Sequence, residues 1–350
     1  MKLKISLAIS VVVVVIAIIV WNQKGSTMAH ASDYQIDRNY YIVIDSNSAW
    51  FNVLVNGISV QLYNGADPFN ITFPINHLMQ SDKNQITYNF VSLLPGDHAN
   101  DEGFGPTKDF SVHISIESID LDTHERERIT LVDARYDMET GQLVSNEHTI
   151  HGTEPVYRQS RMHTSGDLRL KEGFTFMDGE GPALPSQHLI AEFHTQDRFP
   201  RFHWLDEATV LEDTPELREG LRNAYRHIHD LMERGDFRGI RKLMDEGWKN
   251  AAITLNLGHT ADDFLRNNET HKRYVKVRDD GSILKPLHFD HLGAPLTSDH
   301  IQFMDDGRVV RMLPDPIQWQ RPGARNSTIA SFVFYVTEEG EWKVAAIITG

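Results

Sequence analysis

Apolar and polar residues alternate with a period of two through most of the chain between residues 35 and 205, which is the pattern of half-buried β-strands. Two such runs, Phe51–Val55 and Ile58–Tyr63, are separated only by Asn56 and Gly57. Asn-Gly favours a two-residue hairpin turn because both positions need a positive φ. Further strand-like runs span residues 40–44, 70–73, 85–91, 110–119, 128–133 and 188–194. The spacing of these runs predicts an antiparallel β-sandwich over residues 35–205.

Residues 137–187 lack this alternation. They are rich in Gly, Pro and polar residues, so we expect few strands there.

The pattern changes to a helical period after residue 205. Thr214-Pro215 is typical of a helix start, with a capping residue followed by Pro at the first helical position. An apolar stripe then runs from Leu217 to Met232, and Gly235-Asp236 ends it. A second stripe begins at Phe237, and Thr260 with Asp263 forms a capping-box pattern that opens a third, short helix.

From about residue 283 the period returns to two. Asp306-Gly307 separates two strand-like runs, and Glu338–Gly340 separates two more. Helices followed by antiparallel strands predict an α+β domain over residues 206–350, with helices packed on a curved sheet.

This second half resembles the SnoaL-like and ketosteroid-isomerase-like superfamily of cone-shaped α+β folds. The resemblance rests on Arg222 to Phe237, with its Gly-Asp break between helices, and on the final hairpin from Phe334 to Val344. It implies a pocket inside the cone and no particular reaction, because members of one fold carry out many functions. The stretch 74–86 resembles the edge of galactose-binding-like or immunoglobulin-like accessory sandwiches.

The N-terminus predicts export. Lys2 and Lys4 precede an apolar run from Ile5 to Trp21, 17 residues that would form about 26 Å of helix. This length is just enough to cross a bilayer. Ala29-His30-Ala31 offers a cleavage site, so residues 1–31 are either a transmembrane anchor or a signal peptide cut after Ala31. Either alternative places the remainder on the periplasmic side of the inner membrane, tethered by a single pass or released.

Composition narrows the function classes. The 350 residues hold no Cys, which excludes disulfide frameworks, thiol nucleophiles and iron–sulfur clusters. The formal net charge is −15, and most of the excess acid lies in residues 32–205. An acidic chain lacks the basic surface that nucleic-acid binding needs. No cofactor motif is present, and we expect no cofactor.

Polar residues at 288–300 are the candidates for chemistry. Asp290, Asp299 and His300 could form a carboxylate–histidine acid–base pair in the cone pocket. Together with His288 and His291 they fall within 13 residues, but no recognised metal-ligand spacing is present, so we predict no metal. His227 and His229 lie two residues apart on the first helix, on opposite flanks, and cannot share one ion.

Tyr225, Tyr335 and Trp342 lie on the elements that carry the resemblance, and we expect them to line a ligand pocket. Trp50, Tyr63, Phe104 and Trp204 are candidates for stacking on sugars.

The sequence is consistent with three functions. The leading hypothesis is a membrane-tethered envelope protein without catalysis that binds a small molecule or a protein. One version is an immunity-type protein that blocks a delivered toxin. The alternatives are a small-molecule enzyme using the acid–base pair in the cone, and carbohydrate binding through the β-sandwich.

Overall fold

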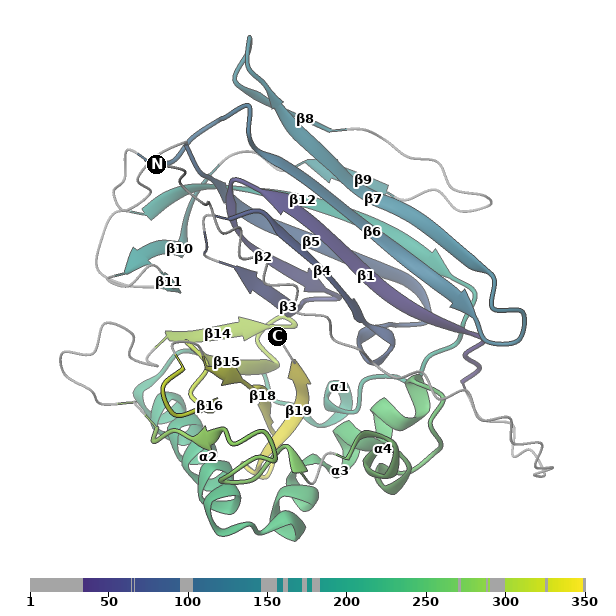
Figure 1. Cartoon of the computed structure of the whole chain (residues 1–350), viewed down its shortest axis with the longest axis vertical. Coiled ribbons are helices and arrows are strands. Elements are labelled where there is room, and N and C mark those ends of the chain that lie inside the picture. The colour runs from purple at the N-terminus through teal and green to yellow at the C-terminus, as the bar shows by residue number, and fades with distance from the viewer. Residues whose placement is uncertain are drawn as a thin grey trace, which may run out of the picture. The chain divides into compact units, whose positions relative to one another are not determined.

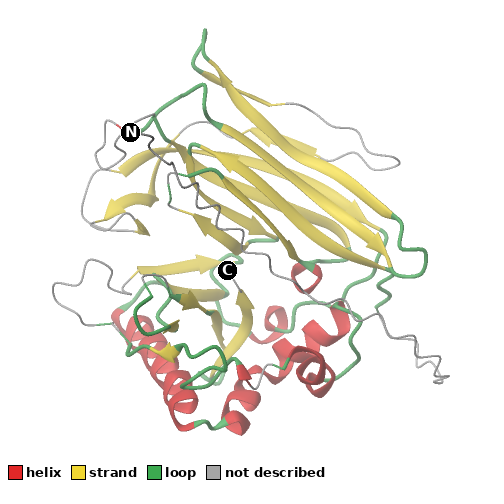
Figure 2. Cartoon of the chain, in the orientation of Figure 1, coloured by secondary structure: helices red, strands yellow, loops and turns green. Residues whose placement is uncertain are grey.

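The structure is a computed structural model of the whole chain, and it describes residues 34–63, 65, 67–94, 103–145, 156–159, 163–171, 175–177, 183–269, 272–287, 289, 300–324 and 327–348. Side chains are described for these residues except 156–186, 300 and 348. Residues 33–350 form one compact unit. Within the described part the chain is mostly antiparallel sheet with a small helical portion (Figures 1 and 2).

Two larger sheets form most of the first half. One has the strand order β4-β1-β6-β7-β8 and the other β11-β10-β12-β5-β2-β3, with β9 added beside β12. The strands are β1 (Arg38–Asn47), β2 (Ala49–Val55), β3 (Ile58–Tyr63), β4 (Phe69–Pro74), β5 (Asp82–Ser92), β6 (Ser111–Asp120), β7 (Arg126–Asp137), β8 (Gln142–Ser145), β9 (Val156–Gln159), β10 (His163–Lys171), β11 (Thr175–Met177) and β12 (Ala183–Thr195), with a 3₁₀ turn η1 (Asn76–Leu78).

The expectation of few strands between residues 137 and 187 is wrong. β8 to β11 and the start of β12 lie there. β9 and β10 pair with β12, and β11 pairs with β10. A neighbouring strand supplies backbone hydrogen bonds even where apolar and polar side chains do not alternate. These strands therefore show little period-two signal in the sequence.

The second half begins with helices and ends with strands. Figure 2 shows the helices gathered beside the sheet of order β14-β15-β18-β19, and β13, β16 and β17 form a smaller one. The elements are α1 (Trp204–Glu207), α2 (Pro215–Arg234), α3 (Phe237–Thr254), α4 (Ala261–Asn268), β13 (Ile283–Leu284), β14 (His300–Met304), β15 (Val309–Leu313), β16 (Gln318–Gln320), β17 (Thr328–Ile329), β18 (Ser331–Val336) and β19 (Trp342–Ile348).

The predicted hairpin turns are confirmed. Asn56 and Gly57 join β2 to β3 with φ values of 48° and 81°. Asp306 and Gly307 lie in the turn between β14 and β15, with φ values of 51° and 82°. The turns touch, because the backbone N–H of Asp305 donates to the carbonyl of Gly57 at 3.4 Å. These turns therefore bring the first and second halves of the chain together.

The two halves also share a core. The larger apolar cluster contains Phe51, Val53 and Tyr88 from the first half and Met304, Val309 and Tyr335 from the second. A second cluster fills the space between α2, α3 and the β15–β18–β19 strands, around Tyr225, Trp319 and Phe332. Since one cluster crosses from half to half, burial of apolar surface stabilises the two together.

No helix among the described residues has the length and hydropathy needed to cross a bilayer. The apolar segment 5–21 and the Ala29–Ala31 cleavage pattern lie outside those residues.

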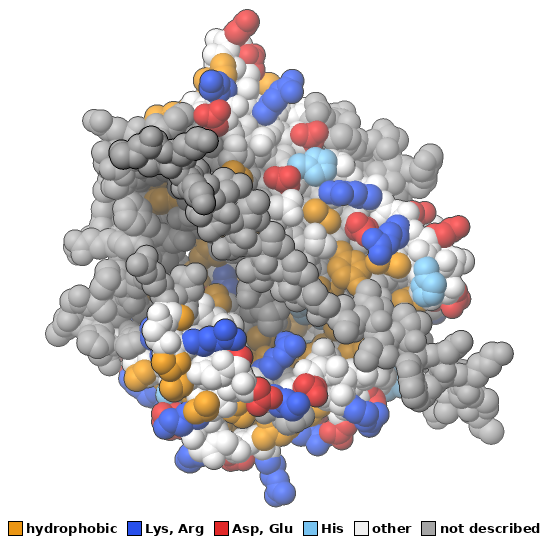
Figure 3. Space-filling model, viewed as in Figure 1, with side chains coloured by type: hydrophobic (Ala, Val, Ile, Leu, Met, Phe, Trp, Pro, Cys, Tyr) orange, Lys and Arg blue, Asp and Glu red, His pale blue; other side chains and the backbone are white. Residues whose placement is uncertain are grey.

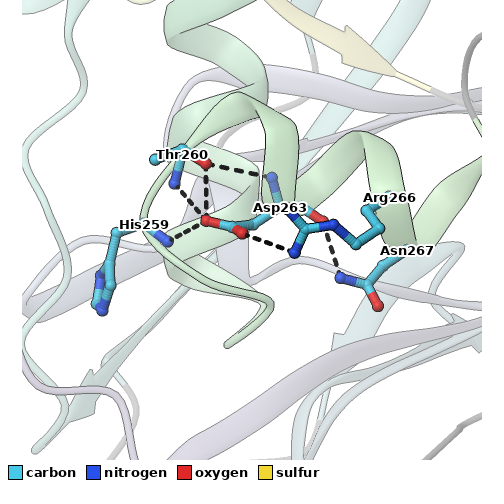
Figure 4. Close-up of polar contacts among 5 residues, drawn as sticks. All are labelled: His259, Thr260, Asp263, Arg266 and Asn267. Atoms are coloured by element: carbon cyan, nitrogen blue, oxygen red, sulfur yellow. Dashed lines mark hydrogen bonds and ion pairs between the residues drawn. The ribbon is translucent and has the colours of Figure 1, made fainter. Parts of the chain in front are cut away.

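The predicted capping box of α4 is present and fully formed (Figure 4). The Thr260 hydroxyl accepts from the backbone N–H of Asp263 at 3.2 Å, and the Asp263 carboxylate accepts from the backbone N–H groups of His259 and Thr260, each at 3.0 Å. The hydroxyl of Thr260 also donates to this carboxylate at 2.7 Å, which lowers the pKa of Asp263. The cluster resembles a binding site, but every group in it serves the helix end.

Replacing Thr260 with Ala removes the capping oxygen, and we expect the free energy of unfolding to fall by about 1 kcal/mol. Arg266→Ala on the same helix removes only a surface ion pair to Asp263 and should cost at most about 0.5 kcal/mol. Urea titration of both variants checks this, and equal losses would contradict the capping role.

Candidate anion-binding cleft

The residues that sequence reasoning placed at 288–300 cannot be assembled into a site. Asp290, Asp299 and His291 lie outside the described residues, as does His288. His300 is the first residue of β14, and its side chain is not described. The acid–base pair therefore stays a prediction.

Tyr225 lies in the core between α2 and the sheet, with no exposed surface. Its hydroxyl donates to the carbonyl of Phe332 at 2.9 Å and accepts from the backbone N–H of Met312 at 3.2 Å. Both hydrogen-bonding functions are therefore used by backbone, and burial raises the pKa of the phenol. Trp342 is half-buried and packs edge-on against Phe334. These two aromatic residues serve packing.

The aromatic candidates for sugar stacking also pack inward. Trp50 and Trp204 are 2% and 1% exposed, and the indole N–H of Trp204 donates to Asp305. Tyr63 packs against Phe69, and Phe104 packs edge-on against Trp50. A flat row of exposed aromatic rings, which sugar binding through the sheets would need, is not formed by these four residues.

Tyr335, the third predicted ligand-binding residue, does lie at a cleft. The cleft has a volume of about 600 Å³ and lies between α3 and the β18–β19 hairpin. Tyr335 and Lys343 line it from the strands, whereas α3 contributes Arg238, Arg241, Lys242, Asp245 and Glu246. Its size is within the range of small-ligand pockets, but charged side chains supply most of its lining.

Three basic residues dominate the α3 wall. Arg238, Arg241 and Lys242 are spaced i, i+3 and i+4, so they share one face of the helix, opposite the buried Ile240 and Met244. On the face drawn in Figure 3, side chains of both charges mix over the helical part of the chain.

One of these basic residues, Arg238, lies in the first turn of the helix, where a cation is disfavoured. α3 begins at Phe237 with Asp236 as its cap and has no acidic residue in its first turn. The N-terminus of a helix is the positive end of its dipole, so nearby cations are disfavoured by about 0.3–1 kcal/mol each. Arg241 is compensated by ion pairs to Asp262 at 2.9 Å and Asp245 at 3.6 Å.

Arg238 and Lys242 are exposed, and neither has an ion-pair partner among the described residues. The carboxylate of Asp236 already stabilises the positive end of α3, so what distinguishes Arg238 and Lys242 is that they share one cleft without a described ion-pair partner. Sequence reasoning assigned α3 from its apolar stripe and overlooked this signal, although three bases and no acid in the first two turns can be read directly from residues 237–243.

Two hydrogen bonds to the exposed carboxylate of Glu207 hold the floor of the cleft. The carboxylate of Glu207, on α1, accepts from the phenol of Tyr335 at 3.2 Å and from Nζ of Lys343 at 2.9 Å. The bond from Lys343, with a smaller contribution from Tyr335, holds the pKa of Glu207 below its usual value. Burial, followed by the charge of Glu207, raises the pKa of Tyr335. Tyr335 is therefore a neutral donor at pH 7 rather than an activated base.

His203 lies behind this pair. Its ring stands edge-on to Tyr335 with centroids 5.7 Å apart, and neither buried ring nitrogen has a hydrogen-bond partner in the described structure. Burial lowers the pKa of His203, an effect that the charges of Glu246 and Glu207 partly offset. The imidazole is therefore uncharged at neutral pH.

The cleft is suited to binding an anion. Four Lys or Arg side chains and two carboxylates line it, whereas the chain as a whole carries a net charge of −15. Guanidinium and ammonium groups recognise carboxylate and phosphate oxygens through charge-assisted hydrogen bonds.

A separate buried carboxyl lies deeper in the second half. Asp315 is 8% exposed, and its Oδ1 atom has no hydrogen-bond partner in the described part of the chain. Burial raises its pKa, and the nearby charge of Arg311 offsets only part of this effect.

No protein-family model matches the chain, and the searches of curated proteins and of solved structures find no significant match.

The raised pKa of Asp315 makes stability depend on pH. A carboxyl whose pKa is higher in the folded state than its ordinary value near 3.9 stabilises the fold fully below that value, and the contribution is lost as the pH rises through the folded-state pKa. Asp315→Asn cannot ionise. We therefore expect the unfolding free energy of Asp315→Asn to rise relative to that of the wild type as the pH increases from about 3 to 7.

Denaturant titrations of both proteins at several pH values measure this difference. The loss of carboxyl contacts can add an offset that is the same at every pH, on top of the pH-dependent change. If the whole difference between the two proteins is the same at every pH, the burial effect is refuted.

Proposed function

We propose that the chain is an exported binding protein that holds an anionic group of its ligand in the cleft between α3 and β19, without a catalytic step of its own. The observation that carries the proposal is the pair Arg238 and Lys242, which line the same cleft and have no ion-pair partner among the described residues. An anion in the cleft would compensate both cations and would also gain from the positive end of α3.

The ligand meets a polar floor. A bound carboxylate or phosphate would lie near Lys343, whose ammonium is already held in place by Glu207. Because this ion pair exists before binding, Lys343 loses little freedom when a ligand arrives. Leu243 and Val344 are the apolar residues of the lining and give limited area for an apolar ligand body.

We further propose the finer architecture that the sequence predicts: an antiparallel β-sandwich over 35–205 and a cone-shaped α+β domain over 206–350. The shared core between the two larger sheets and the packing of α2 and α3 on the last strands support this architecture. In this architecture residues 35–205 hold residues 206–350 in position to bind a partner. The partner is either a small molecule or a protein with an exposed acidic segment. An immunity-type role belongs to the protein-partner version.

Reversing two charges of the cleft tests the anion site. In the double variant Arg238→Glu/Lys242→Glu, attraction is replaced by repulsion, and we expect inorganic phosphate to bind about 5- to 30-fold more weakly. The measurement is the rise in thermal midpoint with phosphate concentration, against chloride at equal ionic strength.

The matched control is Arg266→Glu/Lys272→Glu, which changes the net charge equally but lies outside the cleft. Loss of phosphate response in the cleft variant alone supports the site. An equal response in wild type and both variants would eliminate it.

The export proposal has its own test. Expressed with residues 1–31 in a Gram-negative host, the chain should sediment with membranes, resist a carbonate wash and retain its N-terminal residues in an intact-mass measurement. A periplasmic, soluble product that begins at Ser32 would replace the anchor with a signal peptide. A cytosolic product would contradict export altogether.

A further inference from the structure

A second charged cluster lies on the other side of the α2–α3 turn, within the last two turns of α2. A ring nitrogen of His229 and one carboxylate oxygen each of Asp230 and Glu233 lie within 4.8 Å of one another. His229 and Glu233 are four residues apart, which places them one turn apart on the same face of the helix. The sequence reading paired His229 with His227 and dismissed a shared ion, but the structure brings His229 beside carboxylates instead.

His229 is already oriented as metal-binding histidines are. It is 7% exposed, and its Nε2 lies 2.8 Å from the backbone carbonyl of Lys285. Because a carbonyl only accepts, Nε2 carries the hydrogen in this contact and the lone pair is on Nδ1. No other described residue is hydrogen-bonded to the His229 ring. A backbone carbonyl that fixes the ring and its tautomer is the usual second-shell support of a metal ligand.

The two carboxylates stand where the helix disfavours them. α2 ends at Arg234, and the C-terminus of a helix is the negative end of its dipole. Arg234 follows the usual preference for a cation at this end, whereas Asp230 and Glu233 oppose it. Both carboxylates are exposed, and Lys276 approaches Glu233 only to 3.7 Å. A bound cation would be attracted by both acids and by the helix end.

We propose that His229, Asp230 and Glu233 bind a divalent transition-metal ion, with Zn²⁺ as the reference ion. One imidazole nitrogen and two carboxylate oxygens are a ligand set that zinc accepts, and three protein ligands leave a further position for water or a ligand group. Nδ1 of His229 is the nitrogen that coordinates. The site is independent of the anion cleft, because none of its residues lines that cleft.

The experiment is a calorimetric titration of the full chain, stripped of metal with a chelator, with ZnCl₂. We expect Glu233→Gln to weaken zinc binding at this site by at least about 10-fold, since losing a ligand costs no less than losing a second-shell partner. Glu233 is exposed, so this substitution should leave the fold intact. His229→Ala should abolish binding at the site, with circular dichroism to confirm that the variant is folded.

His227→Ala is the matched control, because His227 is an exposed histidine two residues away on the same helix and outside the cluster. It should bind zinc as the wild type does. Absence of zinc binding by the wild type, or equal affinity in wild type and Glu233→Gln, would overturn the proposal. Zinc should also raise the thermal midpoint of the wild type more than that of Glu233→Gln.

Discussion

The buried guanidinium of Arg311 imposes the strictest requirement on this fold. Arg311 is 3% exposed, and removing a charge from water costs several kcal/mol unless its N–H groups find partners. Its Nε donates to Gln302 at 2.6 Å, and a terminal nitrogen donates to the hydroxyl of Ser59 at 2.8 Å. Ser59 in turn donates to Asn52 at 2.6 Å. The guanidinium on β15 therefore has its full set of partners only when β3, supported by β2, lies against it.

This requirement fixes how the second half meets the first. The β2–β3 and β14–β15 turns touch, and the Met304 sulfur accepts from the backbone N–H of Ser59. Apolar burial alone would tolerate several packings of similar area, whereas a buried polar network with defined partners favours one. The α3–β19 cleft depends on the same packing, because its floor residue Tyr335 belongs to the shared core and is held by Glu207 on α1. Positions of the cleft residues thus follow from contacts made far from it.

Local patterns in the sequence were enough to predict the hairpins, the helix caps and most elements, but not the strands between residues 137 and 187 or the long-range pairing. Asn56-Gly57 and Thr260 with Asp263 each encode a turn or cap within four residues, and both are formed as expected. β9 and β10 carry no such signal, since their pairing with β12 joins segments far apart in the chain. One partner of Arg311 is equally remote, because Ser59 is 252 residues away, whereas Gln302 is only nine residues away. What the sequence could not provide was therefore the long-range pairing.

The same distinction between local signals and long-range contacts applies to the residues of the candidate sites. Tyr335 was found because it lies on the final hairpin, but Glu207 and His203, which complete the floor, come from a short helix without a periodic signal. Tyr225 was expected at a ligand and is a core residue, since a tyrosine on an apolar stripe cannot be distinguished by spacing from one that faces a pocket. Arg238 and Lys242 were readable from sequence, but only by asking which charges oppose a helix dipole.

Charges that oppose a helix dipole are found at both proposed sites. Glu233 lies in the last turn of α2 and Arg238 in the first turn of α3, so each helix end includes a charge that its dipole disfavours, beside the favoured charges of Arg234 and Asp236. The turn at Gly235 separates the acids of α2 from the bases of α3, and none of the described ion pairs joins an acid of the first to a base of the second. If the acids of α2 and the bases of α3 neutralised each other, ion pairs would form directly across the turn. Separate external charges, a cation at the end of α2 and an anion at the start of α3, explain both departures at once.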